Sequence, residues 1–420
     1  MEEHVRAWVL ILIYLPSSLI RFLGHFLPRG LLAQILDAAL EMDLETYVQI
    51  LTSLAPHVSY NLRNKALRAF KLKRDPRIIK SLAPYLTTLQ RCQALNISME
   101  IDDSTIRAEI IAILAPYLDN PRPKTSIYEA LNITYYWPKR LIYEALDITL
   151  SIKNASACAK ALYALAPRFT KELASRALAK ISEIQEEDSL ALALRTLISG
   201  SPPDNLSREL LIQAMEIAVK IKNADACVKV LDTLIPNLPQ DLRDRGRVAK
   251  VSRLTELGHN KTEPDHYRKA LEVIKEIKNE VFRIEALTGL ARYLPTELID
   301  EALTIAQEIR DELGLAEALV TLSPRLPSNL LPEALILATK IGSRDARAKA
   351  LAALAPCLAE LPSRDLYPLW DETLQHLACR TRDDLITDLK ALEPIIRALG
   401  GEEAITKTQR AIQDVQRWWP

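Results

Sequence analysis

The sequence has few aromatic residues, few glycines and no closely paired cysteines. Aromatics make up 5% of its 420 residues and glycines number only 10, whereas hydrophobic residues reach 49%. Leu, Ala and Ile dominate, which favours helices packed through aliphatic side chains and argues against extensive sheet or intrinsic disorder. The five cysteines, none of them in a C-x-x-C pair, are Cys92, Cys158, Cys227, Cys357 and Cys379. The sequence therefore indicates neither a disulfide framework nor a metal cage, and the reducing cytoplasm is the simplest location.

The sequence also lacks net charge and a long apolar run. Basic and acidic residues number 54 each, so the whole chain presents no field that would attract nucleic acid or an acidic membrane. The apolar run Trp8–Leu15 ends at Pro16 and is much shorter than the roughly 20 residues of a membrane span. Two glutamates precede it, where a signal peptide carries positive charge. We expect residues 1–30 to form a degenerate N-terminal capping repeat.

One segment recurs in degraded form along most of the chain. RAKALAALAPCLAELP at Arg347–Pro362 is similar to segments at Arg283–Pro295, Ala316–Pro327 and Arg107–Leu118. Each has small and aliphatic residues at i, i+3, i+4 and i+7, which predicts a helix with one apolar face. Most copies are preceded in the chain by a second helical pattern, EALxIAxxI, as at Glu301–Ile309. A pair of helices is therefore the repeating unit.

Prolines near the helix ends give the period, because Pro84 and Pro116, like Pro324 and Pro356, are 32 residues apart. Two helices of about a dozen residues and two short turns fill that length. A helical hairpin alone cannot cover its apolar faces, so the units must stack. The predicted fold is all-α: a right-handed α-solenoid of roughly ten stacked helical hairpins with a period of about 32 residues.

The hairpin array is expected over residues 31–380, with irregular joints near 119–141 and 240–265. In the second joint, Gly246–Leu257 has the pattern of a closing helix without an opening partner, and Gly258–Pro264 is expected to form a turn. Residues 381–420 are expected to form capping helices. There Gly400 and Gly401 predict a helix stop before a polar helix.

No catalytic pattern is present. The six histidines share no spacing, and no H-E-x-x-H, G-x-S-x-G or G-x-x-x-x-G-K-[ST] motif occurs. We therefore expect a non-enzymatic protein with no cofactor, no metal and no small-molecule substrate.

Two aromatic segments are candidate sites for a protein partner. The first combines the residue types that dominate interaction hot spots, and consists of Tyr135, Tyr136, Trp137, Lys139 and Arg140. It lies between two copies of an IYEAL motif that are too close for a full hairpin, so the aromatics could equally fill the gap left by a lost helix. Trp418 and Trp419 either cap the solenoid or dock on a partner.

Two basic stretches, 63–80 and 243–253, support an alternative function in nucleic-acid binding. The residues that would contact phosphates are Arg63, Arg68, Lys71, Lys73, Arg74, Arg243, Arg245 and Arg247. Charge runs on repeat proteins are more often solvated faces or salt-bridge partners of the next turn. Arg107, Arg283 and Arg347 recur at the same position of the repeat. This recurrence would suit either a row of ligand-binding side chains along one surface or bonds between repeats, and we favour bonds between repeats.

The repeats, together with the ending ALGGEEAITKTQRAIQDVQRWWP at Ala398–Pro420, resemble the C-terminal HEAT- or TPR-like repeat region of bacterial STAND (NB-ARC-type) signalling NTPases. The resemblance covers Leu31 to Pro420. It implies a sensor arm that recognises a trigger, often a protein, and restrains or releases a linked effector. The nucleotide-binding module of that family is absent from this sequence, and so is the W-x-x-L-G-x-x-Y signature of strict tetratricopeptide repeats. The expected function is a protein-binding scaffold or sensor whose partner is not identified by the sequence.

Overall fold

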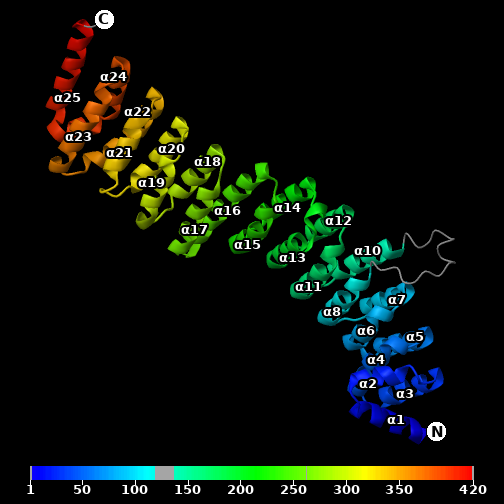
Figure 1. Cartoon of the computed structure of the whole chain (residues 1–420). Helices are drawn as coiled ribbons and strands as arrows, with labels where there is room; N and C mark the ends of the chain where they lie inside the picture. Colours follow the sequence, from blue (N-terminus) through cyan, green and yellow to red (C-terminus); the bar gives the residue numbers. More distant parts are fainter. Residues whose placement is uncertain (1, 119–136, 262, 419–420) are drawn as a thin grey trace. The chain divides into compact units, whose positions relative to one another are not determined.

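The chain folds into paired helices, which confirms the prediction of an all-α helical-repeat fold. The computed structural model describes residues 2–118, 137–261 and 263–418, and these ranges contain no β-strand (Figure 1). The chain divides into two compact units, Met1–Lys220 and Ile221–Pro420. None of the described helices is both long and apolar enough to cross a membrane.

The α-helices of the first unit are α1 (Glu2–Tyr14), α2 (Ser17–Gly24), α3 (Arg29–Met42), α4 (Leu44–Leu54), α5 (Tyr60–Lys73), α6 (Pro76–Leu82), α7 (Thr88–Met99), α8 (Ser104–Leu114), α10 (Trp137–Leu150), α11 (Ala155–Leu165), α12 (Lys171–Ile181), α13 (Glu187–Gly200) and α14 (Arg208–Lys220). Those of the second unit are α15 (Ala224–Leu234), α16 (Gln240–Lys261), α17 (Pro264–Glu276), α18 (Glu280–Ala291), α19 (Ile299–Gln307), α20 (Glu312–Leu322), α21 (Leu331–Lys340), α22 (Arg344–Ala359), α23 (Ser363–Ala378), α24 (Arg382–Ala391) and α25 (Glu393–Trp418).

Short 3-10 helices follow many of these helices. They are η1 (Ala55–His57), η2 (Ala83–Tyr85), η3 (Ala115–Tyr117), η4 (Ala166–Arg168), η5 (Pro203–Asn205), η6 (Ile235–Asn237), η7 (Thr296–Leu298) and η8 (Ser323–Arg325). In η1, η2, η3, η4, η6 and η8 the second residue is a proline that follows the second α-helix of a hairpin. Because proline has no backbone N–H, the helical hydrogen-bond ladder breaks there and one tighter turn follows.

Pro356 is an exception to the predicted helix stops. It lies inside α22, which continues to Ala359. The missing N–H of Pro356 removes one helical hydrogen bond, but Leu354 and Leu358 on either side of it are buried. Burial of that apolar face keeps the segment helical past the proline.

Within each unit the helices form two layers. In the first unit the second helices of successive hairpins pack in the order α4, α6, α8, α11 and α13, and the first helices in the order α5, α7, α10, α12 and α14. The hairpin α7–α8 packs directly on α10–α11, so stacking continues across the predicted joint near 119–141, whose residues 119–136 lie outside the described part.

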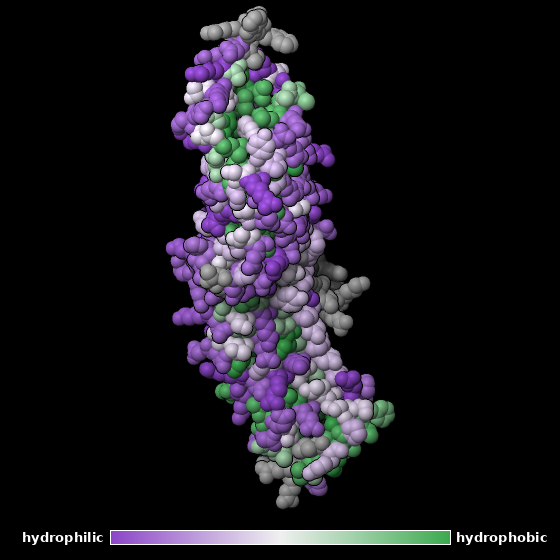
Figure 2. Space-filling model, turned by 90° about the vertical axis from the view of Figure 1, so that its left-hand side faces the viewer, coloured by the Kyte–Doolittle hydropathy of each residue, from purple (hydrophilic) through white to green (hydrophobic). Residues whose placement is uncertain are grey.

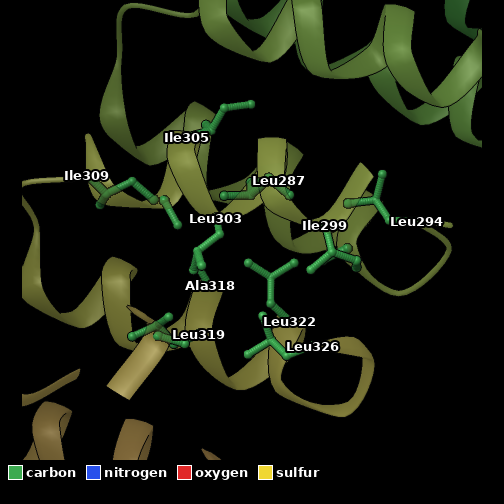
Figure 3. Close-up of a cluster of buried hydrophobic side chains, with 14 of the residues drawn as sticks. Leu287, Leu294, Ile299, Leu303, Ile305, Ile309, Ala318, Leu319, Leu322 and Leu326 are labelled. Carbon is green, nitrogen blue, oxygen red and sulfur yellow. The ribbon is translucent and has the colours of Figure 1, made fainter. Parts of the chain in front are cut away.

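The second unit has one continuous aliphatic core. Figure 3 shows part of it, where side chains of α18, α19 and α20 such as Leu287, Leu303 and Leu322 meet. Its second-helix layer runs α15, α16, α18, α20, α22 and α24. Helix α16 therefore lies in the layer of second helices. It follows α15, another second helix, with no first helix between them, as the sequence pattern at Gly246–Leu257 indicated.

The predicted turn at Gly258–Pro264 is wrong over its first part, because α16 remains helical through Gly258 to Lys261. Gly258 serves helix packing instead of chain reversal. A Cβ atom on Gly258 would lie 2.7 Å from Cζ of Tyr267 on α17, so only glycine allows this close approach of the tyrosine ring.

The predicted helix stop at Gly400 and Gly401 is confirmed. α25 is two helical segments joined across these residues, where Gly401 has φ 63° and ψ −160°. That conformation suits glycine because it has no Cβ atom.

Candidate protein-interaction surface

The predicted aromatic sites fall mostly outside the described residues. Tyr135 and Tyr136 lie in the segment 119–136, and Trp419 lies beyond residue 418. Trp137, Lys139 and Arg140 belong by their backbone to the first turn of α10, and Trp418 is the last residue of α25, but the positions of these side chains are not described. Partner binding by these two segments stays a prediction.

The arginines at one register join each hairpin to itself and to the next one. Arg107 donates to the carbonyl of Ile101 at 2.6 Å, and Arg283 donates to that of Ile277 at 2.7 Å. Arg347 donates to the carbonyl of Ile341 at 3.0 Å. In each case the acceptor lies six residues earlier, in the turn between the two helices of the hairpin, where carbonyls lack a helical partner. The bonds between repeats that the sequence favoured are also present, since Arg283 pairs with Glu308 at 3.5 Å and Arg347 with Asp388 at 2.7 Å, both in the next hairpin.

The basic stretch 243–253 is neutralised by carboxylates of α16 itself and of neighbouring helices. Arg247 pairs with Asp244 at 2.9 Å and with Glu276 at 3.2 Å. Lys250 pairs with Asp232 at 2.7 Å. Arg243 donates to the carbonyl of Leu238 at 2.8 Å. Of the three arginines predicted to contact phosphates here, only Arg245 is exposed and without an ion-pair partner among the described residues. This stretch offers little free positive charge.

The stretch 63–80 is neutralised in part. Lys65 pairs with Asp37 at 2.6 Å and Lys71 with Glu100 at 2.9 Å, while Arg63 donates to the carbonyl of Tyr85. Four basic side chains remain exposed and form no ion pair within the described ranges: Arg68, Lys73, Arg74 and Lys80. Lys73 is the last residue of α5 and Arg74 follows it, so two of these four charges lie at the C-terminal end of that helix.

A groove that the sequence did not indicate lies between α16 and α18. It has a volume of about 480 Å³. Val251, Ala286 and Leu290 are buried and provide its apolar lining. Gly289 also lines it, and a Cβ atom at Gly289 would meet nothing within 4 Å. A close contact between helices therefore does not require glycine at this position, and the missing side chain leaves open space in the groove.

The groove also carries aromatic and acidic side chains. The rings of His259 and Tyr293 meet edge-on with centroids 5.5 Å apart, and Tyr293 is 45% exposed. Glu256 pairs with Arg253 at 2.8 Å. Glu285 is exposed and has no ion-pair partner in the described part of the chain. The arrangement combines an apolar floor, a ring pair and one free carboxylate, which suits an extended peptide with a basic side chain.

Sequence reasoning missed this groove because its walls are residues 248–259 and 285–293, which meet only when α16 packs on α18. One local signal was available. Gly289 stands in the middle of a helix, where glycine costs about 1 kcal/mol relative to alanine, so its presence there calls for another reason.

Over residues 2–118, 137–261 and 263–418, no group of three His, Cys, Asp or Glu side chains is arranged to hold a metal ion.

Comparison with known proteins finds similarity only among solved structures. No protein-family model matches the chain, and no curated protein matches it. The karyopherin Kap121p bound to the SUMO protease Ulp1p is 13% identical with a TM-score of 0.35, over 95% of this chain and 49% of the karyopherin. Kap121p bound to Nup53p is 14% identical with a TM-score of 0.35, over the same shares of 95% and 49%.

A circular tandem repeat protein with novel repeat topology is 16% identical with a TM-score of 0.21, over 100% of this chain and 99% of that protein. The chain spans about half the length of the karyopherins that it matches. At these identities the similarity concerns the helical-repeat fold alone.

Proposed function

We propose that this chain is a non-enzymatic helical-repeat scaffold that binds an extended protein segment carrying a Lys or Arg side chain in the groove between α16 and α18. The observation that carries the proposal is the free carboxylate of Glu285 in a groove that also holds the His259–Tyr293 ring pair. The aromatic rings supply contact area at low entropy cost, and the carboxylate selects the charge of the ligand.

Filling the groove tests the proposal without disturbing the fold. Gly289→Leu places a side chain where a Cβ atom meets nothing within 4 Å. Leucine is also a better helix former than glycine by about 0.5–1 kcal/mol. We expect Gly289→Leu to fold at least as stably as the wild type and to lose peptide binding by tenfold or more, which corresponds to about 1.4 kcal/mol.

The probe is a random 12-residue peptide library displayed on phage and selected on the intact chain, with affinity of the enriched peptides measured by fluorescence anisotropy. Enriched peptides should share a Lys or Arg beside an apolar residue. Glu285→Gln should weaken them by several-fold. Glu272→Gln, at an exposed glutamate of α17 outside the groove, is the matched control and should have no effect. Peptides whose binding survives Gly289→Leu would refute the groove as the site.

The resemblance of Ala398–Pro420 to the repeat region of STAND-type NTPases supports a more specific version, in which the bound protein is the trigger or effector of a bacterial signalling or defence system in the cytoplasm. Affinity capture from nuclease-treated lysate with wild-type protein and with Gly289→Leu tests this version. A signalling component retained by the wild type and lost with the variant would support it, and retention that does not differ between the two would contradict it.

A nucleic-acid-binding function is the second candidate, because Arg68, Lys73, Arg74 and Lys80 are exposed without ion-pair partners in the described residues. If they contact phosphates of single-stranded nucleic acid, the logarithm of affinity should fall with the logarithm of salt concentration by about 0.7 for each phosphate neutralised. Arg68→Glu with Lys73→Glu should abolish binding, whereas Lys65→Gln, at a lysine already paired with Asp37, should change it little.

A further inference from the structure

The first two helices expose several large apolar side chains, which we together call the N-terminal apolar face. It consists of Trp8, Ile11 and Tyr14 on α1, Leu19 and Phe22 on α2, and Phe26 just after α2. Tyr14 is 86% exposed, Phe22 62% and Phe26 71%, and the rings of Phe22 and Phe26 lie 5.3 Å apart. Figure 2 shows hydrophobic surface gathered at the lower end of the view, where these helices lie. Several large apolar side chains exposed on two neighbouring helices favour an interaction site.

This face is not needed for packing within the fold. α1 packs on α3 and α4 through its opposite side, where Val5, Val9 and Leu12 are buried. α2 packs on α4, with Ile20 buried.

Apart from Glu2 and Glu3 at the start of α1, the charged residues of α1 and α2 are basic. Residues 4–36 contain no Asp and no Glu, and they include Arg6, Arg21 and Arg29. Arg21 and Arg29 are exposed, and neither has an ion-pair partner among the described residues. Although the chain as a whole is neutral, two exposed positive charges therefore lie close in the sequence to the apolar side chains. Two copies of the chain that met through this face would bring like charges together, which disfavours self-association.

We propose that the N-terminal apolar face docks on the surface of an anionic lipid bilayer. Amphipathic helices bind bilayers by burying aromatic and aliphatic side chains at the boundary of headgroups and acyl chains, while basic residues stay among the phosphates. Trp and Tyr favour this boundary, and here Trp8 and Tyr14 stand on the same face as Ile11. Docking is peripheral, since α1 has only 13 residues and a spanning helix needs about 20.

Vesicle co-flotation with the full-length chain tests the proposal. The probes are unilamellar vesicles of phosphatidylcholine alone and with 30% phosphatidylserine, at low and high salt. We expect binding to the anionic vesicles to exceed that to neutral ones and to fall with salt. Arg21→Gln and Arg29→Gln should each weaken it by about fivefold, and Phe22→Ser with Phe26→Ser by well over tenfold.

The matched control is Leu313→Ser, at a leucine that is 61% exposed on α20, and it should leave vesicle binding unchanged. All substituted side chains are exposed, so circular dichroism and the melting temperature should match the wild type. Equal binding to both kinds of vesicle, or no binding, would overturn the proposal. So would a concentration-dependent dimer in sedimentation velocity that the Phe22→Ser, Phe26→Ser variant abolishes without any vesicle binding, because the face would then pair with a second copy.

Discussion

Removing Arg347 should destabilise the second unit more than removing Arg283, the arginine at the equivalent position of another hairpin. Arg347 on α22 and Asp388 on α24 are both 0% exposed, and Nε of Arg347 donates to Oδ2 of Asp388 at 2.7 Å. Nη1 of Arg347 donates to the carbonyls of Ile341 and Gly342, each at 3.0 Å. One guanidinium therefore holds the hairpin turn and the next hairpin together inside the core.

The magnitude follows from what each substitution leaves behind. Arg347→Met strands the carboxylate of Asp388 in the core, and an unpaired buried charge costs about 3–5 kcal/mol. The ion-pair partner of Arg283 is Glu308, at 3.5 Å and 61% exposed, so Arg283→Met leaves that carboxylate in water. Its cost is chiefly the lost hydrogen bonds to the carbonyl of Ile277, about 1–3 kcal/mol. Replacing both buried partners, as Arg347→Met with Asp388→Leu, should recover most of the loss.

The two arginine variants should also differ in their dependence on pH. Burial raises the pKa of Asp388 above its ordinary value, although the hydrogen bond from Arg347 acts in the opposite direction. A carboxyl whose folded-state pKa is raised favours the folded state when protonated, so its contribution is full below the unfolded pKa and is lost as pH rises through the folded pKa. Without the hydrogen bond from Arg347, the folded-state pKa of Asp388 should rise further and the dependence of stability on pH should become steeper. The destabilisation by Arg347→Met should therefore shrink as pH falls toward about 4, the ordinary value for Asp, while that by Arg283→Met should not shrink in this way.

Urea unfolding followed by circular dichroism measures the total loss, and hydrogen exchange of peptides from α22 to α25 locates it, because repeat arrays open locally. Equal losses for Arg347→Met and Arg283→Met would refute the reasoning. A double variant no more stable than Arg347→Met alone would refute it as well.

Three further substitutions or treatments test packing, burial and capping. Gly314→Ala places a Cβ atom in steric overlap with Cδ1 of Ile284, so we expect a loss of about 1–3 kcal/mol in the free energy of unfolding by urea. An unchanged midpoint would show that the Ile284 side chain moves aside without cost. Burial raises the pKa of Cys158 to about 11, so native protein at pH 8 should be alkylated by iodoacetamide at the exposed Cys379 and not at Cys158; similar labelling of both, by mass spectrometry, would contradict this. Asn223→Ala removes the side chain that caps α15 and should lower stability by about 1 kcal/mol, whereas Asn223→Asp should retain most of it.

The charge pattern was a poor guide to the candidate sites, and the reason is physical. The run of basic residues at 243–253 is visible in the sequence, but the carboxylates that neutralise it, Asp232 and Glu276, come from α15 and α17. The groove could not be predicted from the sequence for the same reason, because Glu285 and Tyr293 come close to His259 only through the packing of α18 on α16. Which charges pair and which surfaces open depends on neighbours far away in the chain, and a linear pattern does not contain them.

Much of the fold was determined by the sequence alone, since it depends on interactions over a few residues. The i, i+3, i+4 pattern specifies each helix, Asp43 caps α4 by accepting from the backbone N–H of Thr46 at 2.7 Å, and Gly400 and Gly401 break α25. The register of Arg107, Arg283 and Arg347 likewise depends on a carbonyl six residues earlier.

Only the tertiary structure decided how these elements are used. Gly258 has the appearance of a turn residue, yet it allows the ring of Tyr267 to pack against α16. Pro356 has the appearance of a stop, yet α22 runs past it. The apolar segment Trp8–Leu15 has the pattern of an ordinary repeat helix, but with one side packed on α3 and α4 its other side remains exposed. A helix has the same local sequence whether one or both of its faces find a partner, and the number of partners is a property of the packed structure.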